Sequence, residues 1–443
     1  NGNITKTLIQ LSWPITIGLL MQTGFNIVDT MFVGRISADA LAAVSMTFPI
    51  IFLFIALASG VGVGTMSLVA RKIGQGKKEH AGIAAEQSFL IALVLGISFI
   101  ILGFLFTEPL FKLMGAGDAL LPIALSYMHP IYIGIVFMFL AFASTSTLRG
   151  AGDMKTPMKV MILVTILNVF LDWILIFGKG PIPAMGVPGA AWATVISRTV
   201  AFVYIFSHLL FRQNLLPMRL KYIRPDMNVI KKILSVGIPT SLSNVSLSIS
   251  MFFMFRLASV FGPATIAAYG LGFRIDSVAF MAIFGIASAT VTFVGQNTGA
   301  KQMKRAVKAT WTAARMAVLL MGFLGVAFFI FRRAFAGLFT SDSLIIAATS
   351  EYILLVSLTY FSVALGVVTM SSFQGMGRGM PLLLMTILRF FVIMLPLSYI
   401  LSVVAGLGAT GIWAGIAIAN IVVGIVEGIW FWRSTRITRS DKT

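Results

Sequence analysis

Two aspartates lie inside stretches of the sequence that are otherwise too apolar for anything but a membrane-spanning helix. Asp29 follows the apolar run 15–28, and Asp172 lies within 160–177, where most neighbours are Ile, Leu, Val, Phe or Met. A charged carboxylate in hydrocarbon costs at least about 2.5–3.5 kcal/mol, so such a residue is retained where it is paired or used. The two acids therefore predict an ion or proton site. The alternative is that each acid neutralises a membrane arginine, and Arg198 is the first candidate.

Counting along the predicted helices places several oxygen-bearing side chains at one depth. Asp29, Asp172 and Thr194 each lie five or six residues below the outer surface, which is roughly 7–9 Å at 1.5 Å per residue. Asn168 lies one turn deeper than Asp172 on the same helix face. Two carboxylates, an amide and a hydroxyl would form the oxygen-rich pocket that hard cations prefer, and two facing acids in a low dielectric can also share a proton.

The composition is that of an all-α integral membrane protein. Hydrophobic residues make up 58% of the chain and charged residues 11%, with a mean hydropathy of +0.98, whereas soluble domains have about 25% charged residues. Twelve transmembrane helices are predicted, near residues 7–33, 43–70, 85–107, 121–148, 157–177, 188–211, 230–258, 265–295, 308–330, 346–372, 381–403 and 410–432. The first span is too long for a cleavable signal peptide. The chain has no cysteine and only three scattered histidines, which disfavours metal sites other than one for Na⁺.

The net charge of +19 reflects membrane topology rather than nucleic-acid binding. Of the Lys and Arg residues in the segments between spans and in the C-terminal tail, 22 lie on one side of the membrane and 5 on the other. By the positive-inside rule, the basic side is cytoplasmic, and both termini lie there. We therefore expect a multi-pass protein of a prokaryotic plasma membrane, in contact with anionic lipid and without a nucleic-acid partner.

The second half of the chain repeats the first. Four motifs recur at an offset of 225 residues: 12–14 with 237–239, 41–45 with 266–270, 69–74 with 294–299, and 148–152 with 373–377. A fifth pair, 189–193 and 411–415, is offset by 222. We predict two pseudo-symmetric six-helix lobes around a central cleft: an N-terminal lobe (1–211), a basic cytoplasmic linker (212–232), and a C-terminal lobe with a basic tail (233–443). Such a monomer is typical of an alternating-access carrier.

Several helix breakers lie within the predicted spans. Pro14 precedes Asp29 by about four turns on the same helix, so a bend at this proline would move the acid. Gly60, Gly62 and Gly64 cluster in the second span. The alternative for any one of them is that membrane helices merely tolerate it.

Several motifs together resemble the multidrug and toxic compound extrusion (MATE) family, and within it the prokaryotic branch related to DNA-damage-inducible protein F. The motifs are those at 12–14, 28–34, 148–153, 168–172 and 189–194. The resemblance implies that a cation site is formed by Asp29, Asn168, Asp172, the carbonyl of Ala190, and Thr194. It also implies that Pro14 is the bending point of the first helix.

The second lobe offers less. A different branch of the family places its cation site there, with acids in helices seven and ten. Here helix seven has no acid and helix ten only Glu351, at its outer end. Asp276, close to Arg274, is predicted to be the one acid deep in this lobe. We interpret it as a structural or gating polar contact rather than an ion site.

These observations predict a secondary active efflux transporter and not an enzyme. No catalytic constellation or phosphate-binding loop is present in the sequence, and no cofactor is expected. The transporter would export amphipathic or cationic compounds in exchange for H⁺ or Na⁺, with Gln22, Asn26 and Asn168 as candidate substrate contacts. The 24 methionines suit a broad-specificity binding surface. The alternative function is a flippase of lipid-linked precursors in the same superfamily.

Overall fold

The structure is a computed structural model and describes residues 2–114, 116–179, 181–211, 216–218 and 224–440. Parts of the predicted linker, at 212–215 and 219–223, and the end of the predicted basic tail, at 441–443, lie outside the described residues. The described chain contains twelve helices or helix pairs long and apolar enough to cross a membrane. The all-α, twelve-span fold class is therefore confirmed.

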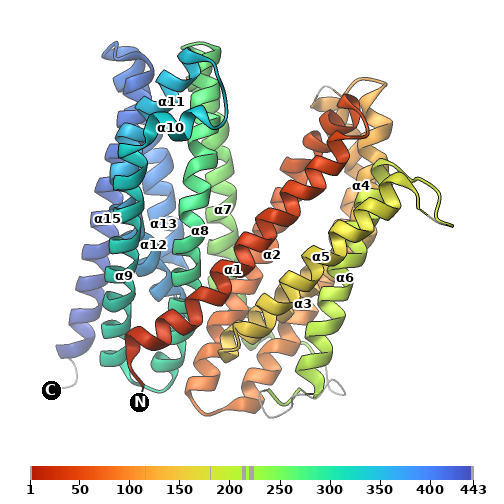
Figure 1. Cartoon of the computed structure of the whole chain (residues 1–443). Helices are drawn as coiled ribbons and strands as arrows, with labels where there is room; N and C mark the ends of the chain where they lie inside the picture. Colours follow the sequence, from red (N-terminus) through yellow and green to blue (C-terminus); the bar gives the residue numbers. More distant parts are fainter. Residues whose placement is uncertain (1, 115, 180, 212–215, 219–223, 441–443) are drawn as a thin grey trace. The chain divides into compact units, whose positions relative to one another are not determined.

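The first six spans are single helices (Figure 1). They are α1 (Ile4–Gly34), α2 (Ala38–Gly74), α3 (Lys78–Leu113), α4 (Leu120–Ala151), α5 (Lys155–Phe177) and α6 (Val187–Phe211). The next three long helices are α7 (Met227–Ser259), α8 (Pro263–Gly299) and α9 (Met303–Ile330). The equal length of α2 and α8, 37 residues each, agrees with the sequence repeat.

The last three spans are less regular than predicted. The span predicted at 346–372 consists of α11 (Ser343–Val356), the 3₁₀ turn η2 (Ser357–Thr359) and α12 (Tyr360–Gly375), and an unpredicted short helix, α10 (Arg332–Gly337), precedes it. The next span contains α13 (Met380–Ile387), η3 (Leu388–Met394), α14 (Leu395–Tyr399) and η4 (Ile400–Val404), and α15 (Gly408–Ser440) is the last. Segments η3 and η4 are π-helical and flank Pro396, whose missing N–H and bulky ring disturb the i→i−4 hydrogen bonds.

Local sequence explains where several helices begin and end. Ser37 caps α2 by accepting a hydrogen bond from the N–H of Ala40. Gly152 closes α4 in the left-handed conformation, with φ 97°, which glycine adopts without steric cost. Asp153 follows at once and starts α5, because its carboxylate accepts from the N–H of Thr156 at 3.0 Å.

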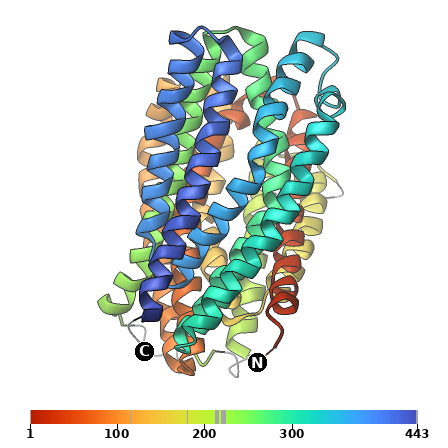
Figure 2. The ribbon, with the colours of Figure 1, turned by 90° about the vertical axis from the view of Figure 1, so that its left-hand side faces the viewer.

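The chain forms two compact units whose boundaries lie inside α1 and α7. One unit contains residues 14–241, and the other contains 1–13 together with 242–443. Each unit therefore includes the first turns of a helix that the repeat assigns to the other lobe. In the second of these units, α8 packs against α9, α11 and α12, and α12 also packs against α15 (Figure 2).

Within the unit 14–241, glycines let the first turns of α7 approach α2 closely. A Cβ atom on Gly60 would lie 2.5 Å from the carbonyl oxygen of Gly237, and one on Gly64 would overlap that of Ile233. The predicted breakers Gly60, Gly62 and Gly64 all lie inside the continuous helix α2. Their role is thus close helix packing, as is common for small residues in membrane helices.

The described part of the linker is anchored to α3 in the same unit. The side-chain amide of Gln87 donates to the carbonyl of Arg224 at 2.8 Å, and its oxygen accepts from the N–H of Asp226 at 3.0 Å. Leu216 and Met218 are buried in the apolar core. This part of the connection is therefore held against the helices.

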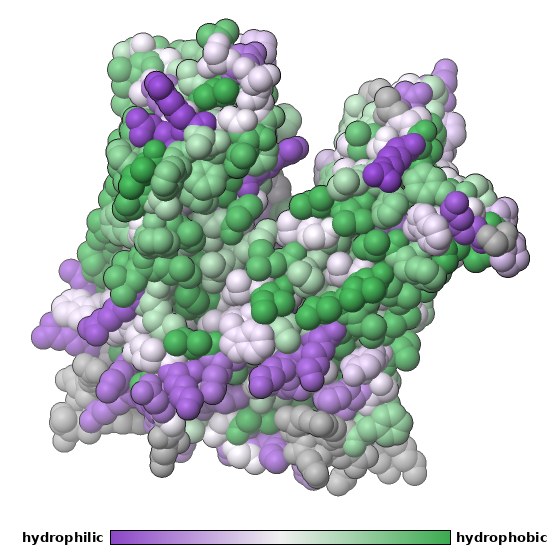
Figure 3. All heavy atoms as spheres, in the orientation of Figure 1, coloured by the Kyte–Doolittle hydropathy of each residue, from purple (hydrophilic) through white to green (hydrophobic). Residues whose placement is uncertain are grey.

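The surface is suited to lipid. Bulky side chains such as Leu105, Val203, Leu319 and Phe323 are more than half exposed. On the face drawn in Figure 3, apolar side chains cover the middle of the helices, and hydrophilic ones gather towards the end at which α1 begins and α15 ends. This distribution fits a multi-pass membrane protein.

Candidate functional site

The predicted cation-site residues lie on α1, α5 and α6 of the unit 14–241. Asp29 lies five residues before the end of α1 at Gly34, and Asp172 lies five residues before the end of α5 at Phe177. The two carboxylates therefore lie roughly 7–8 Å from the ends of their helices, which agrees with the depth count from the sequence.

Close backbone contact joins the end of α5 to the start of α6. A Cβ atom on Gly189 would lie 2.6 Å from the carbonyl oxygen of Leu175, so a larger residue would push the helices apart. The N–H of Met185 donates to the same carbonyl at 2.9 Å, which folds the connecting loop back onto α5. The following residue, Ala190, is fully buried. The loop and Gly189 thus place the first turn of α6 against the end of α5.

Contacts also attach α1 to α5. The hydroxyl of Thr165 donates to the carbonyl of Met21 at 3.4 Å. Nearer the helix ends, the rings of Phe32 and Phe177 pack with their centres 5.9 Å apart. These contacts hold the half of α1 that carries Asp29 beside the helix that carries Asp172.

The polar side chains of the predicted site are buried and lack hydrogen-bond partners in the described structure. Asn168 and Asp172 are fully buried, and Asp29 is 9% exposed. Both oxygens of Asp172, both polar atoms of Asn168, one oxygen of Asp29, and the hydroxyls of Thr194 and Ser197 are unpartnered. A buried, unsatisfied polar group costs about 1–3 kcal/mol. So many in one set of helices point to a site built for a ligand that takes oxygen donors or a proton.

The two carboxylates lie near each other, and a tyrosine lies near both. Asp29 is within electrostatic range of Asp172, and the phenol of Tyr127 on α4 interacts with both acids. Tyr127 is itself buried, at 5% exposure. Sequence reasoning missed this residue, although it lies within the predicted span 121–148, and a phenol in such a span was the available signal.

The repeat shows that the polar set belongs to one lobe only. The second-lobe residues equivalent to Asp29, Asn168, Asp172 and Thr194, at offsets of 225 and 222, are in that order Met254, Phe390, Met394 and Ile416. All four are apolar. Of the surrounding residues, only the tyrosine is retained, because Tyr352 lies 225 residues after Tyr127. The two lobes therefore share a framework but not a cation-binding chemistry.

The candidate substrate residues on α1 are connected to Arg198 on α6. Arg198 donates to the side-chain oxygen of Gln22 at 3.1 Å, and the amide nitrogen of Gln22 donates to Asn26 at 3.3 Å. Asn26 is exposed. No ion pair among the described residues joins Arg198 to Asp29 or Asp172. The alternative in which Arg198 neutralises the two acids does not hold in this part of the chain.

In the second lobe, Asp276 is buried and accepts hydrogen bonds from two phenols. Tyr352 donates to one carboxylate oxygen at 2.6 Å, and Tyr360 donates to the other. Arg274 is not among the ion-pair partners of Asp276 in the described structure. The contacts of Asp276 join α8 to the helices that follow α10.

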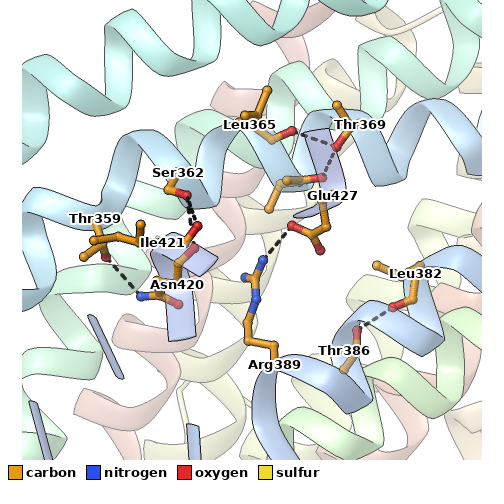
Figure 4. A network of polar contacts seen from close by, with 12 residues as sticks. Thr359, Ser362, Leu365, Thr369, Leu382, Thr386, Arg389, Asn420, Ile421 and Glu427 are labelled. Atoms are coloured by element: carbon orange, nitrogen blue, oxygen red, sulfur yellow. Dashed lines mark hydrogen bonds and ion pairs between the residues drawn. The ribbon is translucent and has the colours of Figure 1, made fainter. Parts of the chain in front are cut away.

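Asp276 is not the only buried acid of the second lobe, as the sequence analysis had predicted. Glu427 on α15 is 4% exposed and forms an ion pair of 2.8 Å with Arg389 in the π-helical segment η3 (Figure 4). Gly366 on α12 leaves room for the carboxylate, since a Cβ atom there would overlap it. The signal was present in the sequence, because both charged residues lie inside predicted spans.

Comparison with known proteins identifies the family. The family model described as MatE matches twice, at residues 14–174 and 239–400, and the two matches begin 225 residues apart. The chain is 30% identical to the FAD transporter of Shewanella oneidensis over 95% of this chain and 93% of that protein. It is 28% identical to the probable multidrug resistance protein NorM of Thermotoga maritima over 95% and 90% of the two chains.

Solved structures agree with this assignment over nearly the whole chain. A MATE protein in the bent conformation matches with a TM-score of 0.94, at 31% identity over 99% of this chain and 97% of that chain. A MATE protein in the straight conformation matches with a TM-score of 0.92, at 32% identity over 99% and 98%. With the family model matching both halves of a twelve-span helical chain, the protein belongs to the MatE family of multidrug and toxic compound extrusion transporters.

Proposed function

We propose that this transporter exports amphipathic or cationic compounds in exchange for H⁺ or Na⁺, and that the coupling ion binds at Asp29 and Asp172. The observation that carries the proposal is the set of buried, unpartnered polar atoms on α1, α5 and α6. Asn168, Thr194 and the carbonyl of Ala190 would complete the site. Because neutral oxygens surround two acids, a single monovalent cation or a proton would offset part of the negative charge.

The ion would act on the substrate by competition. Gln22 and Asn26 lie on the same helix as Asp29 and within two turns of it, so a cationic substrate held there would be attracted by the same carboxylates. Loading the site with H⁺ or Na⁺ removes that attraction and favours substrate release. By linkage, substrate must weaken ion binding by the same factor.

Bending of α1 would move the site between its two states. Pro14 lies inside α1 and at the boundary of the compact unit that contains Asp29. A proline inside a helix lacks the N–H for one backbone hydrogen bond and favours a kink. Related MATE proteins have been solved in bent and straight conformations, which supports the same pair of states here. The branch related to DNA-damage-inducible protein F remains our assignment for this chain.

The substrate class is the part of the proposal that needs the broadest test. Relatives named as multidrug resistance proteins support small-molecule export. The Shewanella relative is named a FAD transporter, so FAD belongs in the panel beside cationic dyes. The flippase alternative predicts that lipid-linked precursors move and that an ion gradient has no effect. We place both termini in the cytoplasm on the strength of the charge asymmetry.

Transport into inverted membrane vesicles tests the proposal. We expect an imposed pH or Na⁺ gradient to drive uptake of a cationic dye by the wild type, and Asp29→Asn and Asp172→Asn to abolish it at normal expression. Asp118→Asn is the matched control, because Asp118 is exposed and lies between α3 and α4. Normal gradient-driven uptake by either site variant would show that the acid has a structural role.

A further inference from the structure

The contacts of Arg198 point to a role in controlling α1. Its guanidinium donates to Gln22 at 3.1 Å and lies over the ring of Phe25, 4.9 Å from the ring centre. Both partners are on α1, and all three residues belong to the unit 14–241. Arg198 therefore holds two points of the helix that carries Asp29, from a position one turn beyond Thr194 on α6.

The cost of placing Arg198 in a span indicates that these contacts matter. An arginine near the middle of a membrane helix is expensive unless it is paired or used. The ion pairs found in the described chain do not include Arg198. Its charge is instead stabilised by an amide oxygen and an aromatic face, and both interactions depend on the position of α1.

Simple geometry shows that these contacts cannot survive a bend at Pro14. Gln22 lies eight residues beyond Pro14 and Phe25 lies eleven beyond it, or about 12 Å and about 16 Å along the helix. A kink of about 20° would displace the two side chains by about 4 Å and about 6 Å. A hydrogen bond of 3.1 Å would be broken by the smaller of these movements.

We propose that Arg198 is a positioning residue that latches the ion-binding half of α1 in one conformation and releases it when the helix bends at Pro14. This inference rests on the proposed bending of α1. The latch is connected to the ion site, because Gln22 also donates to Asn26, which lies three residues before Asp29. Arg198 would thus set the ratio of the two conformations, and the coupling ion would act against that ratio.

The size of the effect follows from the type of contact. A hydrogen bond from a charged donor changes an equilibrium roughly ten- to hundredfold. Arg198→Gln should therefore raise the bent-to-straight ratio of α1 by that factor. Gln22→Glu should lower it, because a carboxylate opposite the guanidinium strengthens the latch.

Distance measurement by double electron–electron resonance in nanodiscs tests the latch. The chain has no cysteine, so cysteines introduced at Ile27 and Val203, both about 55% exposed on α1 and α6, can be spin-labelled selectively. Ile27 lies about 20 Å beyond Pro14, and a 20° bend would move it by about 7 Å. Arg35→Gln is the matched control, since Arg35 is exposed just after the end of α1.

The expected result is two distance populations whose ratio moves in opposite directions in Arg198→Gln and Gln22→Glu and stays unchanged in the control. Gln22→Leu removes the same hydrogen bond from the other helix and should resemble Arg198→Gln, even if that variant folds poorly. In transport assays, Arg198→Gln should change turnover more than the apparent affinity for dye.

Two results would overturn the latch, and they differ in what they say about coupling. Wild-type ratios in both Arg198→Gln and Gln22→Leu would refute the latch while leaving ion-coupled transport intact. A single distance in every variant, at any pH or Na⁺ concentration, would refute both the latch and the bending of α1. The ion site at Asp29 and Asp172 would then still be judged by the vesicle assay.

Discussion

Removing the carboxylate of Glu427 should destabilise the transporter strongly, because it leaves Arg389 without its partner. The two side chains are only 5% and 13% exposed and meet at 2.8 Å. Breaking a buried ion pair from one side costs about 3–5 kcal/mol, which is roughly two to three and a half orders of magnitude in the folded-to-unfolded ratio. We expect Glu427→Gln to lose stability of this order.

The assay is reversible unfolding in mixed detergent micelles, followed by helical circular dichroism. Because the cost comes from the unpaired charge, the double variant Glu427→Gln with Arg389→Gln should be more stable than Glu427→Gln alone. Gly366→Ala should resemble Glu427→Gln, since its Cβ atom would displace the carboxylate. Wild-type stability of Glu427→Gln, or additive losses in the double variant, would refute the ion-pair argument.

Three further outcomes follow from the structure. Pro14→Ala should lower turnover more than dye affinity in vesicle transport, because it restores a backbone donor to α1; equal losses of both would indicate that Pro14 only shapes the site. Gly64→Ala should sharply reduce the yield of folded protein, whereas Gly322→Ala should not, since a Cβ atom on Gly322 has no neighbour within 4 Å; size-exclusion profiles compare the two. Tyr352→Phe should cost about 1–3 kcal/mol of stability in the same micelle unfolding assay, because it removes a donor from the buried Asp276, and an unchanged midpoint would contradict this.

Much of the architecture could be predicted because membrane helices leave clear traces in the sequence. Apolar runs identify the spans, and a constant offset of 225 identifies the repeat. Counting residues from the predicted helix ends was enough to place Asp29 and Asp172 at one depth. These features depend on distance along the chain, which the sequence records directly.

Features that depend on contacts between helices could not be predicted in the same way. The assignment of the first turns of α7 to the unit 14–241 depends on how closely Gly60 and Gly64 let two backbones approach. The pairing of Arg389 with Glu427 joins residues 38 positions apart on different helices. The contact of Arg198 with Gln22, rather than with an aspartate, depends on which face of α6 meets α1.

The most direct test of the proposed ion site is equilibrium binding of a cationic dye to purified protein while Na⁺ concentration and pH are varied. We predict that raising Na⁺ or lowering the pH weakens dye binding about five- to hundredfold, and that Asp172→Asn removes this dependence. Wild-type dye affinity that stays constant with Na⁺, and from mildly acidic to mildly alkaline pH, would contradict competition at Asp29 and Asp172.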